Sequence, residues 1–253
     1  MSFGTPHRHF RLVDSTNRVA RELAADGAPH GTVVTAEEQS AGRGRQGRSW
    51  SAPRGGALLY SAVVTSLDSR HALLPLAVPL AVCEAVEALR PEVACMVKWP
   101  NDVWLDGRKL AGILIEARPQ DGWAVVGVGL NLSIATDEFP PDLRDTATSL
   151  FASDAGGRGG SRRSLPAVAP EGLPPTPHTA TEVLNRHLSS WLDADRDAVL
   201  AAWRSRDALL GREVSWNGGS GVADGIDASG DLLVVGAGGE RFVLGAGEVH
   251  LLI

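Results

Sequence analysis

Apolar positions in the first part of the chain follow both helical and strand spacing. A helix is predicted to begin after residues 14–16, whose side chains all suit an N-cap, and to end at Gly27. A more apolar helix is predicted over residues 76–89, because the backbone ahead of Pro91 disfavours continuing it. Runs rich in β-branched and apolar residues predict strands at residues 32–36, 58–65, 93–99, 103–105, 110–117 and 123–132.

The pattern changes after residue 151. Residues 152–178 are rich in Gly, Ser, Arg and Pro with almost no periodic apolar positions, which predicts a flexible insertion. Helical spacing returns over residues 181–210, and short apolar runs then predict strands at residues 214–216, 232–235, 241–244 and 249–253. We therefore predict an α+β fold: a mixed, largely antiparallel sheet with flanking helices in residues 1–210, followed by a small β-barrel in residues 211–253.

Composition narrows the functional classes. The formal net charge of −6 argues against broad electrostatic capture of nucleic acid, so any anion site must be local. Cys83 and Cys95 lack the spacing of a zinc site and are predicted to be buried free thiols, and no metal ligands are predicted. The most apolar stretch, residues 73–83, is short and contains two prolines. We expect a cytoplasmic protein that binds neither nucleic acid nor membrane.

Residues 42–50, GRGRQGRSW, are the densest chemical signal. Glycines let backbone N–H groups approach an anion closely, and the guanidinium groups of Arg43, Arg45 and Arg48 offer forked donors that match phosphate oxygens. Trp50 could stack on a base or a ring system. The segment therefore predicts an anion-binding loop.

The loop by itself allows two other interpretations. Gly42, Gly44 and Gly47 match the GxGxxG fingerprint of dinucleotide-binding folds, but that fingerprint must open a helix in a βαβ unit. The Ser, Pro and Gly residues after Trp50 exclude a good helix. A mobile, solvated basic turn is the alternative that this segment leaves open.

Three further segments are ambiguous when each is taken alone. Residues 98–103, KWPNDV, combine a base, an aromatic ring and two polar side chains, or form an ordinary Asn-Asp turn with Lys98 solvated. Residues 109–116, KLAGILIE, begin a strand whose lone Lys109 is either a catalyst or a strand-edge charge. Residues 127–131, GVGLN, place glycines within a strand, which indicates either close approach of a ligand or a β-bulge.

Together these segments resemble the biotin protein ligases, whose catalytic domain carries GRGRxGRxW, KWPND, KLAGIL and GxGxN motifs in this order. Residues 14–17 also match the family's early DSTN, and Gln39 precedes the loop. The resemblance covers roughly residues 10–150, whereas residues 211–253 match only in general character. It implies a sheet related to class II aminoacyl-tRNA synthetases and lipoate ligases, followed by an SH3-like barrel.

The resemblance also implies a role for each matching residue. The implied biotin contacts are Ser15, Thr16, Gln39, Gly42, Arg43, Arg45, Lys109, Gly112 and Gly129. The implied nucleotide contacts are Arg43, Arg45, Arg48, Trp50, Asn101 and Asn131. Arg45, Arg48 and Lys109 would assist catalysis. Asp102 is the candidate to orient or deprotonate the acceptor amine.

The implied reaction uses ATP and Mg²⁺ to make biotinyl-AMP and then acylates a lysine of a biotin carboxyl carrier domain. Biotin's carboxylate is already ionised at neutral pH, so the first step needs positive charge rather than a base. A lipoate or octanoyl ligase and a non-catalytic biotin sensor are the alternatives. Because few residues precede Asp14, we expect a ligase without the DNA-binding domain that some members carry.

Overall fold

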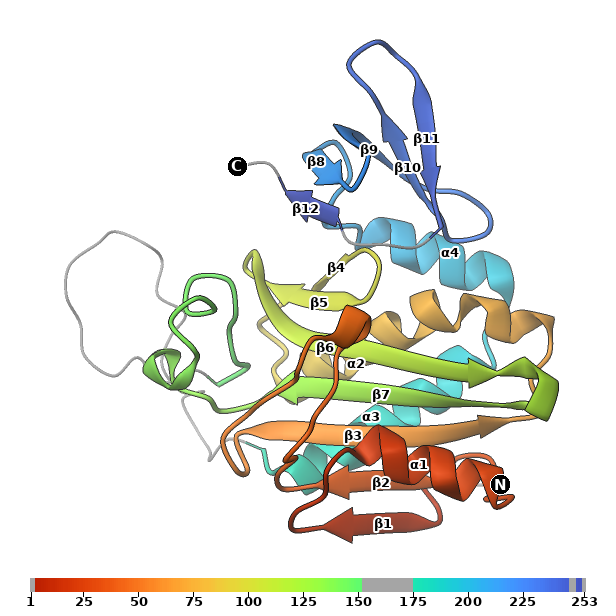
Figure 1. Ribbon diagram of the computed structural model, residues 1–253, viewed down its shortest axis with the longest axis vertical. Helices are drawn as coiled ribbons and strands as arrows, with labels where there is room; N and C mark the ends of the chain where they lie inside the picture. The colour runs from red at the N-terminus through yellow and green to blue at the C-terminus, as the bar shows by residue number, and fades with distance from the viewer. Residues whose placement is uncertain (1–2, 152–174, 246–248, 252–253) are drawn as a thin grey trace.

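The computed structural model describes residues 3–151, 175–245 and 249–251 (Figure 1). Most of the insertion predicted at residues 152–178 therefore lies outside the described residues. Its last residues were placed wrongly, because Thr176 caps helix α3 (Pro177–Leu192) by accepting a hydrogen bond from the Thr179 N–H group. Helical structure thus resumes before the predicted boundary.

A seven-stranded sheet forms the centre of the molecule, in the order β1-β2-β3-β7-β6-β5-β4. Only β1 and β2 run parallel, which confirms the predicted mixed, largely antiparallel sheet. The strands are β1 (His7–Phe10), β2 (Val33–Ala36), β3 (Ala57–Thr65), β4 (Met96–Lys98), β5 (Asp102–Leu105), β6 (Arg108–Arg118) and β7 (Trp123–Asn131). Strand β1 was not predicted, since it is a mostly exposed edge strand of polar residues.

Helices cover both faces of this sheet (Figure 1). Helix α1 (Thr16–Ala25) packs Ala20 and Ala24 against valines of β2, β3 and β7 on one face. Helices α2 (Leu74–Leu89) and α3 lie on the other face within the main core. The helical segment predicted at residues 181–210 is two helices, because Asp195 caps a separate α4 (Arg196–Ser205) by accepting the Ala198 N–H.

Helix α2 is a core helix. The stretch Ser69–Leu89 is long and apolar enough to cross a membrane, but 67% of its most apolar window is buried within the protein. Cys83 of α2 and Cys95 are both buried and free, as predicted. Hydrogen bonding to Cys95, followed by burial, raises the pKa of the Cys83 thiol well above its ordinary value.

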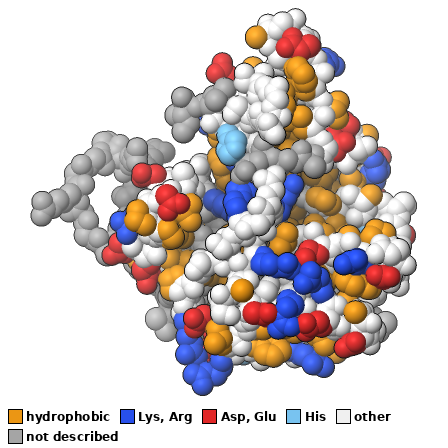
Figure 2. All heavy atoms as spheres, in the orientation of Figure 1, with side chains coloured by type: hydrophobic (Ala, Val, Ile, Leu, Met, Phe, Trp, Pro, Cys, Tyr) orange, Lys and Arg blue, Asp and Glu red, His pale blue; other side chains and the backbone are white. Residues whose placement is uncertain are grey.

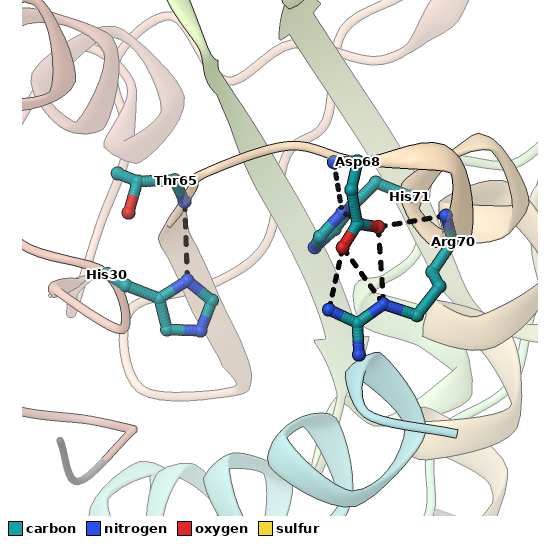
Figure 3. A network of polar contacts seen from close by, with 5 residues as sticks. All are labelled: His30, Thr65, Asp68, Arg70 and His71. Atoms are coloured by element: carbon teal, nitrogen blue, oxygen red, sulfur yellow. Dashed lines mark hydrogen bonds and ion pairs between the residues drawn. The ribbon is translucent and has the colours of Figure 1, made fainter. Parts of the chain in front are cut away.

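A polar turn fixes the entry into α2. Asp68 caps the short helix η2 (Ser69–Leu73): its carboxylate accepts the Arg70 N–H at 2.9 Å, and its own N–H donates to Nδ1 of His71 at 2.9 Å (Figure 3). The Arg70 guanidinium beside it lowers the pKa of Asp68. Nearby, the N–H of Thr65, at the end of β3, donates to His30 (Figure 3). These contacts hold the β3–α2 connection in place.

The C-terminal strands form a second, antiparallel sheet in the order β11-β10-β9-β8-β12. They are β8 (Glu213–Trp216), β9 (Gly219–Ile226), β10 (Leu232–Val235), β11 (Arg241–Leu244) and β12 (Val249–Leu251). Strand β9 was missed because its glycines interrupt the apolar alternation. Among the described residues no ladder joins β11 to β12, so closure into an SH3-like barrel stays a prediction.

The two sheets share one hydrophobic core. Val214, Leu232 and Val249 of the C-terminal sheet belong to the same buried cluster as helices α2 and α3. The indole N–H of Trp99, between β4 and β5, also donates to the Gly230 carbonyl at 3.1 Å. The C-terminal sheet is therefore packed onto the larger sheet rather than tethered beside it (Figure 1).

Asp207 is a buried carboxylate at this junction. It is 8% exposed, its Oδ1 accepts the Leu209 N–H at 2.8 Å, and its Oδ2 has no hydrogen-bond partner. Burial raises the pKa of Asp207. The folded state therefore holds this proton more tightly than the unfolded chain, and the stability that the carboxyl contributes declines as the pH rises through the two pKa values.

The substitution Asp207→Asn removes this pH dependence. We expect it to raise the free energy of unfolding at pH 7.5 by about 1 kcal/mol, because the amide carbonyl still accepts the Leu209 N–H without placing a charge in the core. The gain should vanish near pH 4, where the carboxyl is protonated in both states. Urea unfolding at the two pH values measures it, and an equal difference at both would contradict the assignment.

Candidate active site

A cavity of about 640 Å³ opens on the α1 face of the large sheet and extends beneath the C-terminal sheet. Of the residues predicted for the site, all except Gly42 line it. They are Ser15, Thr16, Gln39, Arg43, Arg45, Arg48, Trp50, Asn101, Asp102, Lys109, Gly112, Gly129 and Asn131. Segments far apart in the sequence thus converge on one site, as predicted, while the individual roles of these residues stay predictions.

The arginine loop folds back on itself at the mouth of the cavity. The Gly44 N–H donates to the Arg48 carbonyl at 2.7 Å and the Trp50 N–H to the Gly42 carbonyl at 3.0 Å, on either side of the turn η1 (Arg45–Gly47). Gly42 lies outside the lining, but a Cβ atom there would overlap the Trp50 carbonyl oxygen. Lys and Arg side chains gather in and below a recess on this face (Figure 2).

Two of the arginines contact polar side chains from other elements. The Arg43 guanidinium donates to both carboxylate oxygens of Glu116 on β6, at 3.0 and 3.2 Å. Nη1 of Arg45 lies 3.3 Å from Oδ1 of Asn101, whose Nδ2 in turn donates to the Ile113 carbonyl at 2.9 Å. The loop is therefore anchored to β6 and to the β4–β5 connection.

Two glycines make a flat floor for the cavity. Gly112 and Gly129 are direct partners on neighbouring strands β6 and β7, and the Trp50 ring lies against both. A Cβ atom on Gly112 would be 2.9 Å from the ring, and one on Gly129 would overlap it. Trp50 was predicted on the adenosine side and the glycines on the biotin side, but the structure brings all three together. Burial also leaves the Trp50 indole N–H without a partner.

Lys109 and Asp102 form an ion pair in the cavity wall, with Nζ and Oδ1 2.7 Å apart. The contact lacks the alignment of a good hydrogen bond, because Asp102 Oδ1 has no hydrogen-bond partner. The lysine backbone is held by residues 146–148: its N–H donates to the Thr146 carbonyl and its carbonyl accepts the Thr148 N–H. Since Asp102 is only 16% exposed and paired, it is not the exposed aspartate that the sequence suggested.

The opposite end of the cavity is lined by polar side chains at the start of α1. Oε1 of Gln39 accepts the Thr16 N–H at 2.7 Å and lies 3.0 Å from Thr16 Oγ1. Behind them, Ser61 Oγ lies 2.8 Å from Thr16 Oγ1 and 2.6 Å from Asn17 Oδ1. Ser15 is also buried here. Sequence reasoning found Ser15, Thr16 and Gln39, but assigned no role to Asn17 or Ser61.

The C-terminal sheet adds lining residues that sequence reasoning missed. Arg212 and His250 reach the cavity from β8 and β12 or their flanks. Neither lies in a distinctive local motif, so only the packing of the two sheets reveals them. On the β7 side, Asn131 Nδ2 donates to the Thr148 carbonyl at 3.0 Å, which fixes the orientation of its amide. In the part of the chain that is described, no three His, Cys, Asp or Glu side chains are grouped to hold a metal ion.

The fold and the cavity first define a broad class. Residues 9–133 match the biotin/lipoate A/B protein ligase family. A biotin--[acetyl-CoA-carboxylase] ligase of Mycobacterium tuberculosis is 36% identical over 250 residues, covering 94% of this chain and 86% of that protein. A ligase of the same name from Paracoccus denitrificans is 34% identical, covering 93% and 96%. The chain belongs to the biotin protein ligase family.

Solved structures agree with this assignment. A biotin protein ligase from Aquifex aeolicus in complex with biotin and ATP superposes with a TM-score of 0.72 at 26% identity, covering 98% of this chain and 99% of that chain. Some relatives are longer: the chain matches a bifunctional ligase/repressor of Bacillus spizizenii at 37% identity over 145 residues, which is 44% of that protein.

Proposed function

We propose that this protein activates biotin with ATP to biotinyl-AMP and transfers the biotinyl group to a lysine of a biotin carboxyl carrier domain. The observation that carries the proposal is the cavity itself, in which a hydrogen-bonding end at Thr16 and Gln39 continues over a glycine floor to Lys109 and the arginine loop. This order suits a ligand with a polar ring at one end and an anion at the other. The family relatives support the same activity.

In the first step, a carboxylate oxygen of biotin attacks the α-phosphorus of ATP, and pyrophosphate leaves with the electrons of the broken P–O bond. Both reactants are anions, so the barrier is dominated by charge repulsion rather than by proton transfer. Lys109 lies in the wall beside the floor, and Arg45 and Arg48 lie in the loop above it. These cations are positioned to hold the two anions together and to stabilise the charge that develops.

The donor set fits a Mg²⁺ ion that arrives with the nucleotide. Mg²⁺ is commonly bound through substrate phosphates with one or two carboxylates, and the lining of this cavity is rich in arginine and includes Asp102 and Asp145. When bound, the ion would neutralise part of the triphosphate charge. The arginines and Lys109 bind and orient the remaining phosphate oxygens.

In the second step, the acceptor amine attacks the carbonyl carbon of biotinyl-AMP, AMP leaves, and the amine loses a proton. Asp102 is our candidate to position that amine, because its carboxylate lies in the cavity wall with one oxygen already held by Lys109. A carboxylate that shares its charge with a lysine is a weak base, so positioning is the more important part of its role.

The substitution Asp102→Asn tests this assignment. We expect biotinyl transfer from preformed biotinyl-AMP to slow by about 10²-fold, since general acid–base and positioning groups typically contribute 10²–10⁴. Single-turnover transfer to a carrier domain is the measurement, with adenylate synthesis measured separately. Unchanged transfer would remove Asp102 from the second step.

One experiment separates the proposal from its alternatives. The protein is incubated with ATP, Mg²⁺, a carrier domain and either biotin or lipoate, and the mass of the carrier is measured. Addition of biotin alone supports the proposal, and addition of lipoate selects the lipoate ligase. Tight biotin binding without a mass change selects a sensor, against which the presence of both Lys109 and the complete arginine loop argues. The cytoplasmic location, the domain boundary at residue 210 and the lack of nucleic-acid binding stay predictions.

A further inference from the structure

Glu116, on β6, lies behind the polar end of the cavity and contacts three side chains from other elements. Its Oε2 accepts a hydrogen bond from Nδ2 of Asn17 at 2.9 Å. Its Oε1 accepts from Nη1 of Arg21 at 2.9 Å, and both oxygens accept from Arg43. The Glu116 side chain is only 23% exposed, so these partners fix its orientation.

These contacts determine which way the Asn17 amide points. Nδ2 also donates to the Leu114 carbonyl at 3.2 Å, so both of its hydrogens face groups that can only accept. The amide oxygen must therefore face Ser61, whose Oγ is 2.6 Å away. Because that oxygen carries no hydrogen, the hydroxyl of Ser61 donates to it.

The direction then passes to the cavity. With its one hydrogen committed to Asn17, Ser61 can only accept across the 2.8 Å contact, so the Thr16 hydroxyl donates to it. Oγ1 of Thr16 and Oε1 of Gln39 are left 3.0 Å apart with no hydrogen between them, since Gln39 Oε1 accepts the Thr16 N–H. Two acceptor oxygens in contact repel each other unless a ligand supplies a donor.

We propose that Glu116 is a positioning residue for recognition of the substrate's ring. Acting through Asn17 and Ser61, it sets the hydrogen-bond direction so that the cavity ends in two acceptors for a ring N–H group. The ureido ring of biotin has such groups, whereas a lipoate or octanoate tail has none, so the chain of hydrogen bonds selects among the acids of this ligase class. The inference rests on the proposed function and assigns its ligand selectivity to residues outside the cavity wall.

A charge-conserving exchange tests the direction of the chain. The single substitution Asn17→Asp places two carboxylates against each other and should weaken biotin binding by about tenfold or more. Adding Glu116→Gln lets the glutamine amide donate to the carboxylate introduced at position 17, which still accepts from Ser61. The double variant should therefore recover to within about threefold of the wild-type Kd. The KM for ATP should change little in either variant.

Two further variants complete the test, with biotin Kd measured by titration calorimetry on the full chain. Arg21→Gln removes a Glu116 contact outside the chain of hydrogen bonds and should leave the Kd within about twofold. Ser61→Ala frees the Thr16 hydroxyl to donate to Gln39, which abolishes the acceptor pair, and should weaken binding by about tenfold.

Wild-type affinity in Ser61→Ala, or a folded double variant no better than Asn17→Asp, would overturn the inference while leaving the proposed function intact. Absence of biotin binding by the unmodified protein would overturn both. Recovery in the double variant, together with loss in Ser61→Ala, supports it.

Discussion

Replacing Lys109 with alanine should reduce the rate of biotinyl-AMP formation by about 10²–10³-fold, the loss seen when a single group that stabilises transition-state charge is removed. Lys109 lies between the glycine floor and the arginine loop, with its Nζ 5.8 Å from the Trp50 ring centroid and 2.7 Å from Asp102. Its cation is thus placed where two anions must meet. ATP–pyrophosphate exchange dependent on biotin measures this step directly.

The matched control for this prediction is Arg108→Ala. It removes an equal charge from the neighbouring position on β6, whose side chain alternates to the opposite face of the sheet and does not line the cavity. Adenylate formation should stay within about threefold of wild type. If both variants lose activity equally, general electrostatics rather than the placement of Lys109 would explain the effect.

Replacing Gly129 with valine should reduce kcat/KM for biotin by about 10²-fold or more, because displacement of reactants by about 1 Å can have an effect of that size. Gly129 lies opposite Gly112 and beneath the Trp50 ring, where even a Cβ atom overlaps the indole. A valine must push the ring, and with it the loop, out of position. Gly129→Ala should give a smaller loss in the same direction.

Valine favours strands, so the expected loss is one of activity rather than of folding. Ala117→Val provides the comparison, since it adds a β-branched side chain on β6 away from the cavity, opposite Ala124 of β7. Its kinetics should match wild type. Circular dichroism melts of both variants separate the two effects, and a folded Gly129→Val protein with normal kinetics would refute the role of the floor.

Strong local signals explain what the sequence could predict. Helix α1, the strands β2, β3, β5, β6 and β7 and the core helix α2 all have clear apolar periodicity, and each was found within a few residues. The convergence of the arginine loop, Lys109 and the paired glycines followed from motifs in a recognisable order. Both kinds of evidence are local in sequence, where pattern reasoning is strongest.

The missed features depend on packing between distant segments. Strand β1 is polar because it lies at an exposed edge, and β9 is broken by glycines. The position of Trp50 over the floor follows from how the loop folds back, which no local pattern encodes. Glu116 resembles an ordinary strand-end charge until its contacts with Asn17 and Arg43 are seen.

The shared core has a consequence for how this protein can be altered. Arg212 and His250 line the cavity from a sheet whose inner residues pack into the same cluster as α2 and α3. A C-terminal sheet from a relative could not be grafted on as a cassette, because its inward-facing side chains and those of α2 would have to change together. Redesign of acceptor preference through this wall must therefore be accompanied by redesign of the interior beneath it.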